Sequence, residues 1–262
     1  MSGERRGTRR TEADDLAIRV TGVRKLFGTQ VVLDGIDLGV TRGETITILG
    51  RSGTGKSVLL KLIIGLQKPD AGSIQIGGQE IGALSLERLN EVRKKLGFLF
   101  QQAALYDSLT VEENVAFPLA RHTDLPDAER RKRAAELLSR VGLEGELAKM
   151  PADISGGMKK RVGLARALAL DPEIMLLDEP TAGLDPITAA EIIGLIRELR
   201  SMREMSAVVV THDLRSVEAL ADRVAVLNEG SIVIEGSFEE VSRSDDPFVR
   251  AFLRPTFGEK HV

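Results

Sequence analysis

Short apolar runs separated by glycine and polar residues predict the strands of this protein. In the first part of the chain they predict an antiparallel patch, at residues 18–23, 31–33 and 36–40. Continuous apolar runs are typical of buried strands and occupy residues 45–49, 96–100, 174–178, 207–211 and 224–227. Helical patterns alternate with several of these strands, at residues 56–64, 188–201 and 214–220. We therefore predict an α/β fold with a mainly parallel core sheet covered by helices.

The middle of the chain has a different texture. β-branched runs disappear after residue 103, and helix formers dominate over residues 127–141, where one face carries Ala134, Leu137, Leu138 and Val141. The basic run at residues 130–133 is flanked by Glu129 and Glu136, which is typical of a solvated helix face. A further amphipathic run covers residues 159–170. We predict a helical subdomain at about residues 103–170, within one domain of residues 16–236.

Residues 237–262 follow as a polar tail with four large apolar side chains, Phe248, Phe252, Leu253 and Phe257. If Pro247 starts a short helix, Phe248 and Phe252 share a face that suits a hydrophobic groove. That groove lies either on the tail's own domain or on a neighbouring copy.

Composition narrows the class of protein. The chain has 262 residues, 42% of them hydrophobic, which is enough for one large core. Its 36 Lys and Arg against 39 Asp and Glu leave a net charge of −3, so we expect no nucleic-acid partner. Cys is absent, which excludes disulfides and thiolate metal sites. No apolar stretch approaches the roughly 20 residues of a membrane span, and residues 1–15, with four Arg and four acids, predict a flexible arm.

The segment after the predicted strand at residues 45–49 carries the clearest chemistry. It reads Gly50-Arg51-Ser52-Gly53-Thr54-Gly55-Lys56-Ser57, which matches a phosphate-binding loop. The glycines let backbone N–H groups converge on nucleotide phosphates at the N-terminus of the next helix. Lys56 reaches the β- and γ-phosphates, and the Ser57 hydroxyl supplies an oxygen ligand to Mg²⁺. The loop, which we call the phosphate loop, predicts binding of a nucleoside triphosphate.

Two adjacent acids end the apolar strand at residues 174–178. Asp178 closes the strand and Glu179 lies just beyond it. We predict that Asp178 holds Mg²⁺ through water, and that Glu179 orients and deprotonates the attacking water. Two solvated acids at a strand end are the alternative, which the phosphate loop upstream weakens.

A second anion-binding segment precedes the helical run at residues 159–170. Ser155 is predicted as an N-cap, followed by Gly156 and Gly157 with bare N–H groups. It lies 99 residues beyond Lys56 (155 − 56), and nothing in the sequence indicates that it folds back onto the phosphate loop. By itself the segment is also an ordinary helix start.

Taken together, the motifs resemble those of an ATP-binding-cassette (ABC) ATPase over about residues 18–236: the phosphate loop, Ser155-Gly156-Gly157, Asp178-Glu179 and Thr211-His212-Asp213, in that order. The resemblance implies a P-loop ABC ATPase fold with an antiparallel β subdomain and an α-helical subdomain. It also implies ATP as the nucleotide, with Mg²⁺.

Four further roles follow from the resemblance, and each has a blander alternative. Phe27 becomes the aromatic that stacks on adenine, or a core residue. Gln101 becomes the glutamine that touches Mg²⁺ and the transmembrane partner, or part of a solvated loop. Asp185 contacts the opposite subunit, or caps the following helix. His212 becomes the γ-phosphate sensor, or a strand-end histidine bonded to backbone.

In this family two cassettes meet head to tail, so Ser155 to Gly157 of one chain covers the γ-phosphate bound by Lys56 of the other. The resemblance thus implies a homodimer, or a pair with a homologous subunit. It implies Lys56, Gln101, Glu179 and His212 as catalytic residues. It also implies an integral membrane permease as partner, through which the cytoplasmic chain is held peripherally at the inner membrane.

Three segments resemble the subgroup that serves lipid transporters of the Mla/Mce type, in which a lipid-binding partner protein completes the complex. They are Met158 in place of the usual Gln, residues 100–115, and residues 246–252 of the tail. Met158 cannot make the polar contact of a Gln side chain. The resemblance favours docking of the tail against the neighbouring ATPase and predicts lipid transport.

Three other functions share the catalytic residues. An ABC ATPase for a small polar solute is the alternative within transport. A regulatory ABC ATPase, acting on a membrane partner without moving a substrate, is another. DNA-repair ATPases with the same motifs insert a long coiled coil between the phosphate loop and Ser155, for which 99 residues leave no room.

Overall fold

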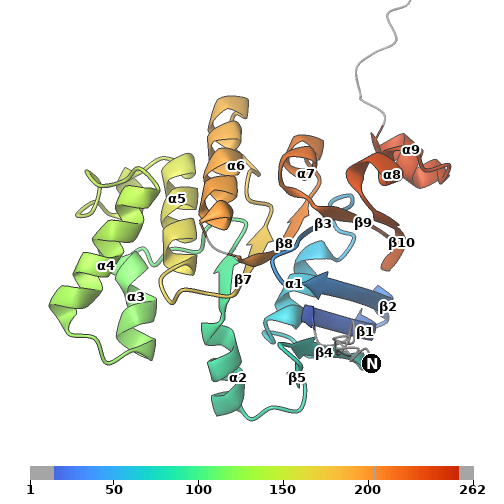
Figure 1. The fold of residues 1–262 in the computed structure, drawn as a ribbon, viewed down its shortest axis with the longest axis horizontal. Coiled ribbons are helices and arrows are strands. Elements are labelled where there is room, and N and C mark those ends of the chain that lie inside the picture. Colours follow the sequence, from blue (N-terminus) through green and yellow to red (C-terminus); the bar gives the residue numbers. More distant parts are fainter. Residues whose placement is uncertain (1–14, 203, 254–262) are drawn as a thin grey trace, which may run out of the picture.

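The computed structural model describes residues 15–202 and 204–253, which form two sheets with helices around them (Figure 1). The predicted N-terminal arm, except Asp15, lies outside these residues, and so does Phe257. Within the described residues no helix combines the length and apolar character needed to span a bilayer.

A six-stranded sheet forms the centre of the molecule. Its order is β10-β9-β3-β8-β7-β6, and every neighbouring pair is parallel except β9 and β10. The strands are β3 (Thr45–Leu49), β6 (Leu96–Leu99), β7 (Ile174–Asp178), β8 (Ser206–Thr211), β9 (Arg223–Asn228) and β10 (Ser231–Gly236). All residues of β3, β7 and β8 are buried, because side chains cover both faces. The predicted mainly parallel core sheet is confirmed.

The antiparallel sheet has the order β2-β1-β4-β5. Its strands are β1 (Leu16–Phe27), β2 (Gln30–Thr41), β4 (Ala71–Ile76) and β5 (Gln79–Glu80). The two predicted runs at residues 31–33 and 36–40 belong to the single strand β2. A shift of register at Gly35, which has a φ of 73°, lets the strand continue between them. Sequence patterns predict no element at residues 71–80, where Gly77-Gly78 turns β4 into β5 with two positive φ angles.

Helices of the core flank both sheets. They are α1 (Lys56–Ile63), α2 (Leu86–Lys94), α6 (Pro186–Ser201) and α7 (Leu214–Leu220). Apolar side chains of α1 pack in one cluster with residues of both sheets, so α1 lies between them (Figure 1). This helix follows β3 directly, which places the phosphate loop at the end of the central sheet.

Three helices fill the predicted helical region and lie beside the six-stranded sheet (Figure 1). They are α3 (Val111–His122), α4 (Asp127–Arg140) and α5 (Gly156–Ala167), with a 3₁₀ turn at Pro151–Asp153 before α5. The predicted amphipathic run at residues 159–170 starts earlier in the structure, because Ser155 caps the helix and Gly156 is its first residue. Their apolar faces share one core with β7, β8 and α6.

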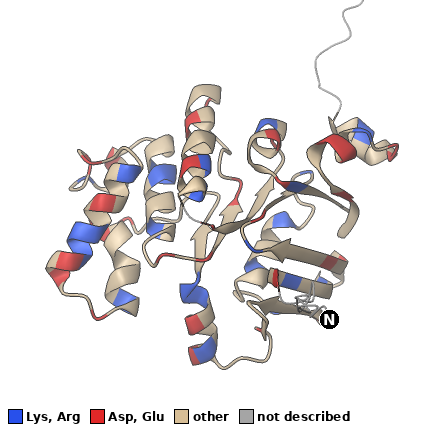
Figure 2. Ribbon diagram, viewed as in Figure 1, with Lys and Arg blue, Asp and Glu red and all other residues tan. Residues whose placement is uncertain are grey.

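Helix α4 carries both basic and acidic residues (Figure 2). Arg130 and Arg131 both pair with Asp127, at 3.4 and 2.9 Å, and Arg133 pairs with Asp171 at 2.5 Å. This agrees with a solvated, charge-paired helix face.

The tail forms two short helices, α8 (Phe238–Ser242) and α9 (Pro247–Leu253). Val249 is only 1% exposed and packs on its own chain, in a cluster with Leu49, Val217, Val224, Val226 and Val241. Phe248, Phe252 and Leu253 are half-buried against the same cluster. The described tail therefore packs on its own domain, as the first of the two alternatives has it. Contact with a second copy stays a prediction.

Candidate functional site

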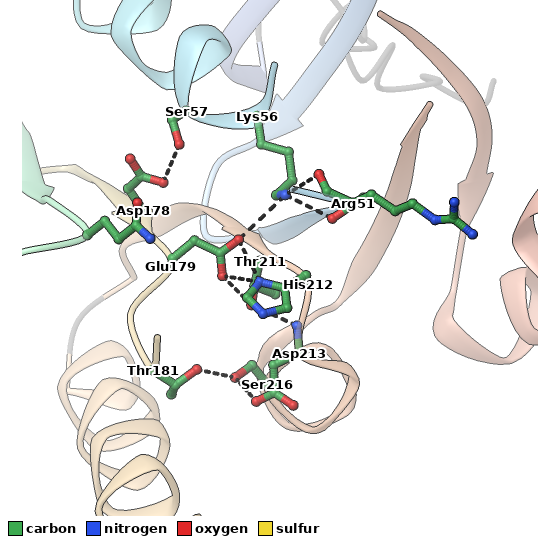
Figure 3. A network of polar contacts seen from close by, with 12 residues as sticks. Arg51, Lys56, Ser57, Asp178, Glu179, Thr181, Thr211, His212, Asp213 and Ser216 are labelled. Carbon is green, nitrogen blue, oxygen red and sulfur yellow. Dashed lines mark hydrogen bonds and ion pairs between the residues drawn. The ribbon is translucent and has the colours of Figure 1, made fainter. Parts of the chain in front are cut away.

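The site lies where three parallel strands end at the same edge of the central sheet. Leu49 of β3 pairs with Thr211 of β8, and Asp178 of β7 pairs with Val210 of β8. Because neighbouring parallel strands end in register, the segments that follow them meet. The phosphate loop, Glu179 and His212 come together in this way from positions far apart in the chain (Figure 3).

The lysine of the phosphate loop donates hydrogen bonds to the backbone of the same loop. Lys56 is 5% exposed, and its Nζ donates to the carbonyl oxygens of Gly50 and Arg51 at 2.8 and 2.9 Å. Burial lowers the pKa of Lys56, and the Glu179 carboxylate opposes this shift. Gly55 has a φ of 101°, and a Cβ there would lie 2.8 Å from Leu33, so the turn into α1 requires glycine. Arg51, Ser52 and Gly53 are exposed.

Ser57 and Asp178 supply the oxygen atoms of a candidate cation site. The Ser57 hydroxyl donates to Asp178 Oδ1 at 2.7 Å. Asp178 is 4% exposed, and burial raises its pKa while the hydrogen bond from Ser57 opposes the rise. A hydroxyl and a carboxylate are hard oxygen donors of the kind that Mg²⁺ prefers, so these residues fit the ion. Within the described residues no three or more His, Cys, Asp and Glu side chains cluster as a metal site.

Glu179 stands at the centre of the polar network (Figure 3). Its carboxylate oxygens both lie 3.0 Å from His212 Nδ1, and Oε1 lies 3.5 Å from Lys56 Nζ. The Thr211 hydroxyl donates to Glu179 Oε2 at 3.2 Å. The partner of His212 is thus a carboxylate, not backbone. Three neighbours fix a carboxylate that is 7% exposed, which is the setting of a general base beside a phosphate-binding loop.

Thr211 and Lys160 both donate hydrogen bonds to Glu179, and the sequence analysis gives neither a role. Thr211 also accepts a hydrogen bond from the Asp213 N–H at 3.0 Å, which fixes the turn before α7. Lys160 donates to the backbone oxygens of Gln101 and Glu179. The sequence does contain a sign that Lys160 is buried. It lies three residues before Gly163 and four before Leu164, which places it on the apolar face of α5.

The Ser155 segment and Asp185 make local contacts in this chain. Ser155 Oγ accepts from the Met158 N–H at 3.2 Å, and Met158 packs partly buried against the helical core. Asp185 Oδ1 accepts from the N–H groups of Ile187 and Thr188, both at 3.0 Å, and so caps α6. Among the residues that the structure describes, no hydrogen bond or ion pair joins Ser155, Gly156, Gly157 or Asp185 to the phosphate loop.

Phe27 and Gln101 lie apart from the carboxylate network. Phe27 ends β1 and is 46% exposed, so the core alternative is wrong for this residue. Lys25 Nζ lies 5.6 Å from the centre of its ring. Gln101 is exposed in the loop after β6, and its carbonyl oxygen accepts from Lys160 at 2.5 Å.

A phosphate loop between β3 and α1, with a buried acid pair at the end of a nearby parallel strand, defines a P-loop nucleoside triphosphatase. The model of the ABC transporter family matches residues 33–182, and the chain belongs to this family. The resemblance drawn from the motifs is confirmed at the level of the ABC ATPase. The chain binds ATP and hydrolyses it to ADP and phosphate.

Relatives of known name are similar over nearly the whole chain. A probable ribonucleotide transport ATP-binding protein mkl, from Mycobacterium leprae, is 43% identical over 91% of this chain and 69% of its own length. A methionine import ATP-binding protein MetN, from Rhizobium johnstonii, is 45% identical over 86% of this chain and 62% of its own length.

Solved structures agree in fold. The ATP-binding cassette MJ0796, dimeric and bound to ADP and Pi in a post-hydrolysis state, matches with a TM-score of 0.78 and 36% identity over 84% of this chain and 98% of its own. The protein cbiO1 from Clostridium perfringens, part of the transporter complex cbiONQ, matches with a TM-score of 0.79 and 33% identity over 92% of this chain and 96% of its own. The P-loop ABC ATPase fold is therefore confirmed.

Proposed function

We propose that this chain is the ATP-hydrolysing subunit of a membrane transporter, acting as a homodimer on a separate permease. The observation that carries the proposal is the buried Glu179 carboxylate, held by His212 and Thr211 and 3.5 Å from Lys56 of the phosphate loop. Family membership and the dimeric cassette MJ0796 support it.

Each of these residues has its own role in ATP hydrolysis. The phosphate-loop N–H groups and Lys56 bind the β- and γ-phosphates. Glu179 accepts a proton from water as the water oxygen bonds to the γ-phosphorus, and the bond from that phosphorus to the bridging oxygen of ADP breaks. His212 orients the Glu179 carboxylate and senses the γ-phosphate. Ser57 and Asp178, with Gln101, would hold Mg²⁺, whose charge favours the transition state.

The remaining ligand residues are proposed to act across a dimer. Ser155, Gly156 and Gly157 lie at the N-terminus of α5, where the helix dipole favours an anion. We propose that they cover the γ-phosphate bound by a second copy and that Asp185 contacts that copy. Phe27, exposed at the end of β1, is proposed to stack on adenine.

An aromatic groove supports docking of a permease. It has a volume of about 470 Å³ and lies between β6, the loop after it and α3, lined among others by Phe98, Phe100, Tyr106 and Phe117. The rings of Phe98 and Phe100 are 4.1 Å apart, and those of Tyr106 and Phe117 are 4.6 Å apart. Tyr106 is exposed, Phe100 and Phe117 are half-buried and Phe98 is buried, so the groove combines an apolar floor with an accessible aromatic edge. A concave surface of this kind suits an amphipathic helix of a partner. Through it the chain is proposed to sit at the cytoplasmic side of the inner membrane.

Two classes of cargo follow from different observations. Met158, residues 100–115 and the tail support a lipid, with a lipid-binding partner protein. The names of the relatives, ribonucleotide transport and methionine import, favour a small polar solute. We propose lipid transport first and keep the polar solute as the second candidate, since every catalytic residue serves both.

One experiment tests the role and separates the cargoes. The tagged full chain is purified from membranes of its own host, and its co-purified permease is reconstituted in phospholipid vesicles with ATP and Mg²⁺. Transfer of labelled phospholipid supports the lipid proposal, and uptake of labelled methionine or ribonucleotide supports the second candidate. Lys56→Ala complexes serve as the control. ATP hydrolysis that moves neither cargo, with loss of the chain altering cell shape, would point to the regulatory alternative.

A further inference from the structure

Lys160 is a buried cation inside the helical core. It lies on α5 and is 4% exposed. Burial lowers the pKa of Lys160 to about 8, and the nearby Asp178 and Glu179 carboxylates oppose this shift. Removing an ammonium group from water is unfavourable unless its donors are satisfied. The contacts of its Nζ therefore indicate what the lysine does.

Both hydrogen-bond partners of Lys160 are backbone oxygens from different motifs. Nζ donates to the carbonyl oxygen of Gln101 at 2.5 Å and to that of Glu179 at 3.0 Å. One side chain on α5 thus bridges the loop after β6 and the turn after β7. These two segments are 78 residues apart in the chain (179 − 101).

The backbone of Glu179 has a conformation that needs support. Its φ is 46°, in the left-handed region that residues other than glycine rarely adopt. The Glu179 N–H donates to the Val210 carbonyl oxygen at 2.9 Å, and the Glu179 carbonyl accepts from Lys160. The Glu179 carbonyl oxygen also accepts from the Ala182 N–H at 3.1 Å, so both peptide groups that flank Glu179 are held by hydrogen bonds, and Lys160 supplies the one that comes from α5. This turn aims the carboxylate at Thr211 and His212.

The loop after β6 is fastened to the same helix at two more points. Arg166 of α5 donates to the carbonyl oxygens of Ala103 and Ala104, at 2.5 and 2.7 Å. These two alanines have φ angles of 59° and 47°. A Cβ on Gly163 would lie 3.2 Å from Ala103 Cβ, so the loop rests directly on α5. The loop and α5 form one packed unit, and Lys160 connects this unit to Glu179.

We propose that Lys160 is a positioning residue for ATP hydrolysis: it ties the turn of Glu179 to α5 and to the Gln101 loop, so that the position of this loop sets the aim of the Glu179 carboxylate. Within the described part of the chain no hydrogen bond or ion pair joins Lys160 to the phosphate loop, so Lys160 acts on the reaction through Glu179. The inference rests on the proposed role of Glu179 as general base. The proposal connects one side of the aromatic groove to Glu179, through the loop after β6 and Lys160.

The test compares steady-state ATP hydrolysis by the purified full chain and three variants. Lys160→Met keeps the length and apolar stem but removes the donors, and Lys160→Gln keeps an amide with two N–H groups. Lys132→Met, an exposed lysine of α4, is the control for loss of a lysine from this region. We expect Lys160→Met to lower kcat by about tenfold with KM for ATP within about twofold, as loss of charged hydrogen bonds predicts. Lys160→Gln should recover most of that loss, and Lys132→Met should match the wild type.

Two results would overturn the proposal. One is a folded Lys160→Met variant whose kcat lies within about twofold of the wild type. The other is a parallel fall of kcat, ATP affinity and melting temperature in both Lys160 variants, which a purely structural role produces. If Lys160→Met does not fold, the test rests on Lys160→Gln. The proposal then requires this variant to have a kcat below that of the wild type but above zero, with an unchanged KM for ATP. Full activity of Glu179→Gln would instead refute the proposed function, whatever Lys160 does.

Discussion

At the scale of single residues, the site consists of buried charges that hold one another. Lys56 and Glu179 are 5% and 7% exposed, and each lies within reach of the other. A buried charge that loses its partner is strongly unfavourable, so these side chains need each other or a charged ligand. Phosphate oxygens of ATP offer Lys56 a competing partner. Substitutions here therefore separate binding of the nucleotide from its hydrolysis.

We expect Lys56→Ala to abolish ATP hydrolysis, because the phosphate loop loses its side-chain cation toward the β- and γ-phosphates. The measurement is phosphate release by the purified chain, with circular dichroism to confirm folding. Retention of more than about a tenth of the wild-type rate would contradict the assignment of the loop.

Glu179→Gln should keep nucleotide binding while removing the base, since the amide preserves the shape of the carboxylate but does not accept the proton. An ATP-bound dimer should then accumulate. Light scattering with ATP and Mg²⁺ measures the mass, and phosphate release measures turnover. Normal turnover by this variant would show that another group is the catalytic base.

At the scale of elements, α9 is attached to the end of the strand that leads into the phosphate loop. Val249 packs in one cluster with Leu49, the residue before Gly50. On the exposed side, the guanidinium of Arg51 lies 5.4 Å from the centre of the Phe248 ring, within the range of a cation–π contact. The tail thus contacts both the residue before the phosphate loop and Arg51 within the loop, and it contributes to the stability of its own domain.

Val249→Ala should lower the free energy of unfolding by about 2 kcal/mol, because it removes buried methyl groups and leaves a cavity. Chemical denaturation measures the change, and Arg250→Ala on the exposed side of α9 is the control. An unchanged unfolding midpoint would contradict the packing of the tail on its own domain. Truncation after Ser244 tests contact with a second copy: it should weaken the ATP-bound dimer more than Val249→Ala does.

At the scale of the whole molecule, Arg223 joins the two sheets. It starts β9 and donates to both carboxylate oxygens of Glu44, at 2.6 and 2.9 Å, and to the Gly39 carbonyl of β2 at 2.5 Å. It also pairs with Glu235 of β10. Burial acts to raise the pKa of Glu44, but hydrogen bonds from Arg223 and Thr41 lower it below its ordinary value.

This pKa predicts a pH dependence of stability. Because the carboxyl pKa is lower in the folded chain than in the unfolded chain, Glu44 stabilises the fold above its unfolded pKa. That contribution is lost as the pH falls through the folded pKa. Glu44→Gln should therefore destabilise the chain by about 1–3 kcal/mol at neutral pH and by progressively less in acid. Urea unfolding at several pH values measures this, and a difference from wild type that is independent of pH would contradict it.

The shared site of the proposed homodimer is also a property of the whole molecule. Ser155→Arg places a bulky cation where Ser155 is proposed to cover the γ-phosphate of a second copy. Mixed with wild type, this variant should reduce activity more steeply than in proportion to its fraction. Mixed dimers of Ser155→Arg and Lys56→Ala should recover part of the activity, since one intact composite site remains. Proportional loss without recovery would indicate sites completed within one chain.

The sequence by itself determined the order of the elements and the chemistry of the loop. The strands at residues 45–49 and 174–178 match β3 and β7, because buried parallel strands are continuous apolar runs. The pattern missed β4 and β5, where the apolar alternation is only Ile74 and Ile76 and the clearer signal is the Gly77-Gly78 turn that follows. It also ended the strand at Gly35, where β2 continues through a bulge.

Only the tertiary structure decided which of these residues meet. The contacts of Glu179 with His212 and Lys56 depend on the order of β3, β8 and β7 in the sheet, which no local pattern encodes. The partners of Lys160 are backbone oxygens, and backbone atoms leave no mark in the sequence. Apolar periodicity records the face that a residue presents to the core, whereas the partner of a buried polar atom depends on how distant segments pack.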